Sequence, residues 1–363
     1  MKNELNFSGG PGILPAEVLT QAQQAIGEVP QVGLSILGIS HRSDWFAQVV
    51  AEAEANIRTL LRLPDSHAVL FLQGGATLQW TMIPMLLLRG SGKSADYLST
   101  GYWSAKAIAE ATLEGPVRVV WDGQAQGYHR LPRATELACS PDAAYLHYVS
   151  NETVEGTQFH ELPGHDSVPR VCDMSSDFLS RPVDMDRYDI LYAHAQKNLG
   201  PAGVTVVIIR KSLLDHAPAG IPALLDYRTH LKAGSIYNTP PVFAIYVVLL
   251  VTRWLLREVG GLEAMAAINQ RKADALYAVL DEYPELYRGW AAREDRSLMN
   301  VAFKLPTPEL EREFLRRSEL EGFSGLAGHR SLGGIRASIY NAMPLASVEA
   351  LCGFMRGFAA GNG

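Results

Sequence analysis

Short apolar runs alternate with helical patterns along most of the chain. Two such runs, Asp189 to Ala195 and Val204 to Ile209, flank a short segment that contains Lys197 and a Gly-Pro turn. This pattern predicts a strand, a tight loop and a second strand. Similar runs predict strands at 68–72, 95–98, 117–121, 144–149 and 168–172. Apolar residues at helical spacing predict helices at 15–26, 45–61, 105–114 and 256–283, one opening at Leu78 and one opening near Pro241.

Strands that alternate with helices predict an α/β fold in which crossover helices wind a mainly parallel sheet. In such sheets, ligands bind beyond the carboxyl ends of the strands. Several residues with useful chemistry follow predicted strands directly: Gly75, Ala76, Thr77, Trp103, Thr153, Asp173 and Lys197. We therefore expect a binding site at this edge of the sheet.

The C-terminal third has a different pattern. A strand at 299–304, a charged amphipathic helix at 308–321, a strand at 334–339 and a helix at 347–358 predict a smaller α+β domain. We predict an N-terminal arm at 1–15, a large domain at 16–256 and a small domain at 257–363.

Composition narrows the class of protein. The 363 residues are 47% hydrophobic, enough for a large core, and the net charge of −6 argues against non-specific nucleic-acid binding. The longest apolar run, Pro241 to Val251, is too short to span a bilayer, so we expect no membrane association. The three separated cysteines form neither a disulfide framework nor a zinc pattern. We expect no metal site, and a reducing, cytoplasmic compartment.

Taken singly, the strand-end residues have ordinary explanations, such as a solvated loop lysine or an aspartate that caps a helix. Together they suit pyridoxal phosphate. Lys197 would bond the aldehyde, Asp173 would face the pyridine nitrogen, and Trp103 could stack on the ring. The Thr153 hydroxyl could bond the ring oxygen, and the small residues at 75–77 could hold the phosphate with bare backbone N–H groups.

Seven motifs then resemble a known family over nearly the whole length: Asn6-Phe7-Ser8, Ser40-His41-Arg42, Gly101-Tyr102-Trp103, Asn151-Glu152-Thr153, Ala195-Gln196-Lys197-Asn198, Asn238-Thr239-Pro240-Pro241, and Gly328-His329-Arg330 with Gly333 to Pro344. They are similar to the phosphoserine aminotransferases, class V enzymes of the fold-type I pyridoxal phosphate group. The resemblance implies transfer of the amino group of glutamate to 3-phosphohydroxypyruvate, giving phosphoserine and 2-oxoglutarate in serine biosynthesis. It also suggests a phosphorylated hydroxythreonine as a second substrate in vitamin B6 synthesis.

The resemblance further implies a homodimer with active sites at the subunit interface. Asn238 and Thr239 would reach the cofactor phosphate of the neighbouring subunit, beside Gln196, and Arg336 would bind the substrate α-carboxylate. A pocket for the distal anion, partly from the partner chain, would consist of His41, Arg42, His329 and Arg330. Some relatives carry arginine in place of Thr77 and serine in place of Gly9, which leaves the full set of substrate contacts open.

Two other functions remain. A class V cysteine desulfurase would need a cysteine on a mobile loop, and only Cys139 lies near a possible loop. A catalytically idle carrier of pyridoxal phosphate would keep the cofactor residues but would not convert glutamate.

Overall fold

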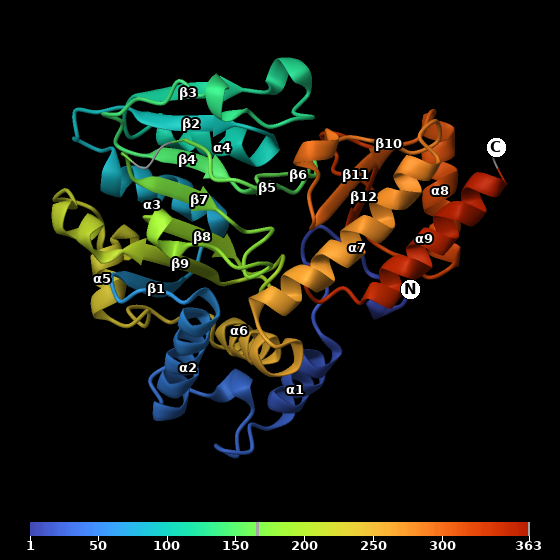
Figure 1. Cartoon of the computed structure of the whole chain (residues 1–363). Coiled ribbons are helices and arrows are strands. Elements are labelled where there is room, and N and C mark those ends of the chain that lie inside the picture. Colours follow the sequence, from blue (N-terminus) through green and yellow to red (C-terminus); the bar gives the residue numbers. More distant parts are fainter. Residues whose placement is uncertain (165–166, 362–363) are drawn as a thin grey trace.

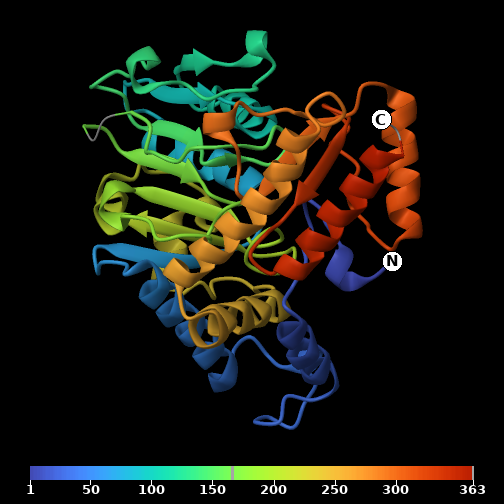
Figure 2. The same ribbon diagram turned by 45° about the vertical axis from the view of Figure 1, so that its right-hand side comes forward.

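The computed structural model describes residues 1–164 and 167–361, and its elements form two groups that each have a hydrophobic core. The larger group surrounds a central sheet, and the smaller one contains the C-terminal elements (Figure 1). Helix α7 (Leu262–Glu282) belongs to both, since Leu262 and Met265 pack in the first core and Leu276 in the second. Figure 2 shows α7 running from the sheet side toward the C-terminal elements. The domain limits given above stay a prediction.

The central sheet has seven strands in the order β1-β9-β8-β7-β4-β2-β3. Neighbouring strands from β8 to β3 pair in parallel, and β9 alone runs antiparallel to both of its neighbours. The predicted α/β class with a mainly parallel sheet is confirmed. The strands are β1 (His67–Leu72), β2 (Ala95–Ser99), β3 (Val117–Asp122), β4 (Leu146–Val149), β7 (Arg170–Asp173), β8 (Ile190–His194) and β9 (Thr205–Arg210).

Helices cover both faces of this sheet, because apolar side chains from alternate strand positions fill two separate clusters. The cluster on one face includes residues of α3 and α4, and the cluster on the other includes residues of α2 and α6. No helix among residues 1–164 and 167–361 is long and apolar enough to cross a membrane. The helices of this group are α1 (Ala16–Gly27), α2 (Asp44–Leu61), α3 (Gly75–Leu87), α4 (Tyr102–Ala111), α5 (Tyr227–Lys232) and α6 (Val242–Trp254).

The smaller group packs α7 and two further helices on a three-stranded antiparallel sheet in the order β10-β11-β12. The N-terminal arm joins this group, because the Phe7 N–H donates to the Ser324 carbonyl at 2.8 Å and the Ser338 N–H to the Phe7 carbonyl at 3.1 Å. Figure 1 places the N-terminus beside these C-terminal elements. The remaining elements are β10 (Arg288–Gly289), β11 (Asn300–Lys304), β12 (Ile335–Ser338), α8 (Pro308–Leu320) and α9 (Leu345–Ala360).

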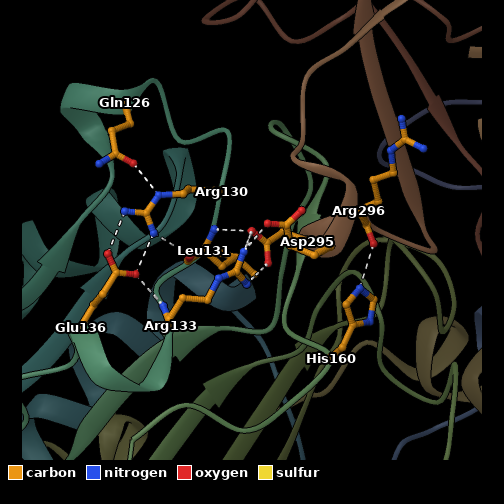
Figure 3. A network of polar contacts seen from close by, with 9 residues as sticks. Gln126, Arg130, Leu131, Arg133, Glu136, His160, Asp295 and Arg296 are labelled. Carbon is orange, nitrogen blue, oxygen red and sulfur yellow. Dashed lines mark hydrogen bonds and ion pairs between the residues drawn. The ribbon is translucent and has the colours of Figure 1, made fainter. Parts of the chain in front are cut away.

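Hydrogen bonds and an ion pair join the smaller group of elements to loops of the larger group (Figure 3). Arg133 Nη1 lies 3.0 Å from Asp295 Oδ1, and the Leu131 N–H donates to Asp295 Oδ2 at 2.9 Å. His160 Nε2 lies 3.0 Å from the Arg296 carbonyl oxygen. The carboxyl edge of the sheet and the strand that carries Arg336 are therefore held in one arrangement.

Some local predictions differ from the structure. Helix α3 begins at Gly75 rather than at Leu78, since Gly74 and Gly75 adopt φ of +85° and +71° and turn the chain directly into the helix. It continues three residues beyond Pro84. Two short elements have no counterpart among the predicted ones, namely helix α5 and a hairpin of β5 (Asn151–Glu152) and β6 (Thr157–Gln158) around Thr153.

Candidate active site

Lys197 occupies the tight loop between β8 and β9, as the apolar pattern predicts. Its Nζ donates to Thr153 Oγ1 at 2.6 Å and to Ser176 Oγ at 3.2 Å. The residue as a whole is only partly buried, but desolvation of its amine lowers the pKa to about 8, against the opposing effect of the Asp173 carboxylate. An amine with such a pKa exchanges protons readily near neutral pH.

Asp173 ends β7, the strand next to β8, so its carboxylate and the Lys197 loop share one edge of the sheet. The side chain is 4% exposed, and its Oδ1 accepts a hydrogen bond from the Ser175 N–H at 2.9 Å. No hydrogen bond within residues 1–164 and 167–361 reaches its Oδ2. A buried carboxylate with a free oxygen suits a protonated ring nitrogen.

Trp103 lies in the first turn of α4, and Lys197 Nζ is 5.1 Å from the centre of its ring. Two buried carboxylates hold this turn in place. Glu152 accepts the N–H groups of Trp103 at 3.2 Å and Ser104 at 3.1 Å, and Glu155 accepts the N–H of Tyr102 at 2.9 Å.

Burial raises the pKa of both carboxyls, and the charge of Glu152 helps to raise that of Glu155 to about 8. Sequence reasoning missed this pair. Acidic residues three apart in a polar turn usually face solvent, and only the apolar strand before them could have suggested burial.

The small-residue segment at 75–77 forms the N-terminal turn of α3, which has no side-chain cap, so its backbone N–H groups are available to an anion. An added Cβ at Gly75 would lie 3.8 Å from the His194 ring. The turn therefore lies beside the end of β8, close to the Lys197 loop. Gln196 of that loop faces the arm, since its Nε2 would lie 3.5 Å from a Cβ at Gly10.

Arg336 projects from β12 onto the N-terminal arm. An added Cβ at Gly9 would lie 2.2 Å from its Nη2, so a residue with a side chain at position 9 would have to displace the guanidinium. Burial lowers the pKa of Arg336, and its charge in turn lowers the pKa of Lys197, which places the two cations near each other. The lack of a side chain at position 9 therefore leaves room for the Arg336 guanidinium beside the arm.

A second set of cationic side chains lies beside Trp103, and the charge of Arg336 acts on its histidine. The His329 ring centre is 4.7 Å from that of Tyr102 and 6.4 Å from that of Trp103. Lys106, and then Arg330, lower the pKa of the Tyr102 phenol. Sequence reasoning did not find Tyr102 or Lys106, although helical spacing puts them on one face of α4.

Four of the proposed site residues come from two other segments of the chain. His41 and Arg42 precede α2, and the Arg42 N–H donates to Ser40 Oγ at 3.1 Å. Asn238 and Thr239 precede α6, and the Thr239 carbonyl accepts Gln73 Nε2 at 2.8 Å. Among the described residues, no hydrogen bond, ion pair or ring contact joins these four to Lys197.

The residues that do converge fit pyridoxal phosphate. They offer a desolvated amine, a buried carboxylate, an aromatic face and an uncapped helix N-terminus. Two buried donors, Trp103 Nε1 and Arg336 Nε, have no hydrogen-bond partner within the described part of the chain. Buried donors without acceptors are costly, and a ligand with oxygen acceptors bound here would satisfy both.

Comparison with known proteins identifies the family. The model of the aminotransferase class-V family matches residues 5–351. A phosphoserine aminotransferase of Rhodopirellula baltica is 51% identical over 358 residues, covering 98% of this chain and 95% of the relative. The chain belongs to the phosphoserine aminotransferase family. As in that family, it is a pyridoxal phosphate-dependent transaminase, and the predicted family is confirmed.

Solved phosphoserine aminotransferases share the fold. The enzyme from Bacillus circulans subsp. alkalophilus superposes with a TM-score of 0.95 at 47% identity, covering 98% of each chain. A pyridoxal phosphate-bound phosphoserine aminotransferase from Trichomonas vaginalis has a TM-score of 0.91 at 37% identity, covering 97% of this chain and 99% of that one.

Proposed function

We propose that this transaminase moves the amino group of glutamate to 3-phosphohydroxypyruvate, giving phosphoserine and 2-oxoglutarate for serine biosynthesis. The observation that carries the proposal is the set of cationic side chains around Lys197 and Trp103. Arg336 suits an α-carboxylate, because a guanidinium binds carboxylates in a bidentate way. His329 and Arg330 beside Tyr102 suit a distal anion.

The residues divide the chemistry among them. Pyridoxal phosphate, when bound, supplies the aldehyde that takes up the amino group and a ring that withdraws electrons from the substrate α-carbon. Asp173 would keep the ring nitrogen protonated, Trp103 would cover one ring face, and the turn at 75–77 would bind the phosphate. The Lys197 amine would move a proton to and from the α-carbon, a task that its pKa of about 8 suits.

The partner chain has a place in this proposal. Among the described residues, no hydrogen bond, ion pair or ring contact joins His41, Arg42, Asn238 or Thr239 to Lys197, and we infer a homodimer in which these four complete the neighbouring site. We propose a cytoplasmic location from the unpaired cysteines, and the phosphohydroxythreonine step of vitamin B6 synthesis as a second reaction.

A cysteine desulfurase is less well supported. A sulfur-accepting cysteine needs an accessible thiolate, but Cys172 and Cys352 are buried and Cys139 is partly buried. Burial raises the pKa of all three thiols.

The test is a half-reaction with glutamate, phosphoserine, cysteine and alanine in turn. The loaded enzyme should lose the visible band of the lysine-bound cofactor with glutamate and phosphoserine, and the products should be the matching 2-oxo acids. Release of sulfide from cysteine would favour the desulfurase. An unchanged band with all four amino acids would favour the idle carrier.

A further inference from the structure

Two buried glutamates of one hairpin bind the backbone of the first turn of α4, and we call them the glutamate pair. Glu152 Oε1 accepts the Ser104 N–H at 3.1 Å, and its Oε2 accepts the Trp103 N–H at 3.2 Å. Glu155 Oε1 accepts the Tyr102 N–H at 2.9 Å. Both glutamates are at most 5% exposed, so their carboxyl groups have little contact with solvent.

The hydrogen bonds of Glu152 favour its ionised form. A backbone N–H can only donate, and one such donor faces each oxygen of this carboxyl group. The Thr100 hydroxyl also donates to Oε1, at 3.3 Å. A carboxylate accepts at both oxygens, whereas protonation would add a further hydrogen among these donors. Burial raises the pKa of Glu152, and the N–H groups of Ser104 and Trp103 act against that rise.

Glu155 differs from Glu152 at its second oxygen. Its Oε2 is buried, and no hydrogen-bond partner meets it within residues 1–164 and 167–361. The two carboxyl groups are also close, since a Cβ added to Gly101 would lie 2.6 Å from both Glu152 Cδ and Glu155 Oε2. A second charge beside the first, without a donor, is strongly unfavourable here, whereas a neutral acid keeps the bond to Tyr102. Burial and the charge of Glu152 accordingly raise the pKa of Glu155 to about 8.

We propose that Glu152 is an ionised positioning residue for Trp103 and that Glu155 is its neutral partner. The glutamate pair then carries one negative charge, and this charge meets the N-terminal turn of α4, where helix N–H groups favour an anion. The use of this placement for the aromatic face of the cofactor site rests on the function proposed above. The two protonation states can be measured without cofactor or substrate.

Other charged and titratable groups act on the glutamate pair from the elements around it. They are Asp173 of β7, Arg336 of β12, Lys197 of the loop after β8 and Tyr128 of the segment after β3. Glutamine at either position of the pair leaves all four in place. The two substitutions make the same chemical change three residues apart, so each is the matched control of the other.

The first experiment observes Trp103 by fluorine NMR of cofactor-free protein labelled with 5-fluorotryptophan. The chain has six tryptophans, and Trp103→Phe identifies the line to follow. Glu152→Gln should shift or broaden this line, because the amide NH2 must face one of two N–H donors. Glu155→Gln should leave it unchanged, because an amide keeps an acceptor for Tyr102 and carries hydrogen where the neutral acid does.

Binding of pyridoxamine phosphate, which forms no bond to the lysine, gives a second measure of the placement of Trp103. Glu152→Gln should weaken this binding about two- to tenfold, the range that one aromatic ring contact is worth. Glu155→Gln should bind as wild type does. A Trp103 line that moves equally in both glutamine variants, or in neither, would overturn the proposal.

Infrared difference spectroscopy tests the neutral state of Glu155 even where Glu152→Gln does not fold. The spectrum of cofactor-free wild type minus Glu155→Gln at neutral pH should contain the carbonyl band of a protonated acid. A carboxylate band in its place would overturn the assignment, as would a Glu155→Gln protein that does not fold. Failure of the proposed function would appear separately, in the half-reactions of the wild-type enzyme.

Discussion

Replacing the buried Lys272 by methionine should make the stability of the protein less dependent on pH. Lys272 lies in α7, is 0% exposed, and donates through Nζ to the carbonyls of Ile339 at 2.9 Å and Tyr340 at 2.7 Å. No carboxylate forms an ion pair with it within residues 1–164 and 167–361. Burial alone lowers its pKa from 10.5 to about 7.

The sign of the effect follows from proton binding. The folded pKa lies below the unfolded one, so the unfolded chain binds the extra proton between about pH 7 and 10.5. Below that window Lys272 is charged in the folded protein, and the desolvation of this buried charge lowers the free energy of unfolding by its full amount. The cost is relieved as pH rises, at up to about 1.4 kcal/mol per pH unit. Because the folded lysine is already half deprotonated at pH 7, this group should raise the free energy of unfolding of wild type by about 2 kcal/mol between pH 7 and pH 9.

Urea unfolding of the cofactor-free protein at both pH values gives the free energies. The free energy of unfolding of wild type should rise relative to Lys272→Met by about 2 kcal/mol between pH 7 and pH 9. The exposed Lys93, replaced by methionine, controls for the loss of one lysine. A difference between wild type and Lys272→Met that is the same at both pH values, or that falls with pH, would refute the reasoning.

Four further substitutions test the site. Lys197→Ala should fold and bind the cofactor but should resist covalent trapping by borohydride; turnover at the wild-type rate would remove Lys197 from the reaction. Asp173→Asn should keep the cofactor and lose most turnover in the half-reaction assay, because an amide cannot stabilise the protonated ring nitrogen. Full activity would mean that Asp173 only accepts the Ser175 N–H and has no part in the reaction. Arg330→Leu should lower kcat/KM about ten- to a hundredfold for phosphoserine and less for glutamate, since the phosphate carries more charge. Arg336→Leu should harm both substrates alike, and stopped-flow half-reactions compare them; a phosphate-selective loss at Arg336 would reverse the two roles.

The sequence predicts the part of the site that follows the strands. Apolar runs locate the strand ends, and the parallel sheet brings Asp173, Thr153 and Lys197 to one edge, so strand periodicity is sufficient for them. It cannot predict the contact of Arg336 with Gly9, because that contact depends on how the arm crosses to the smaller group. Only the apolar strand before Glu152 suggests its burial, since a buried carboxylate needs donors and its backbone N–H partners belong to the separate helix α4.

The single antiparallel strand, β9, has a consequence for the order of folding. In its hairpin with β8, His194 pairs with Thr205, and only the Lys197 loop separates the two residues in sequence. In its pairing with β1, Leu72 pairs with Thr205, and most of the other strands of the sheet lie between these two residues in sequence. Local pairings close at a smaller entropic cost than distant ones, so we expect the lysine loop to form early and the turn at Gly75 to reach it late. The amine would then be in place before the phosphate site exists, and cofactor capture would require that β1 has paired with β9.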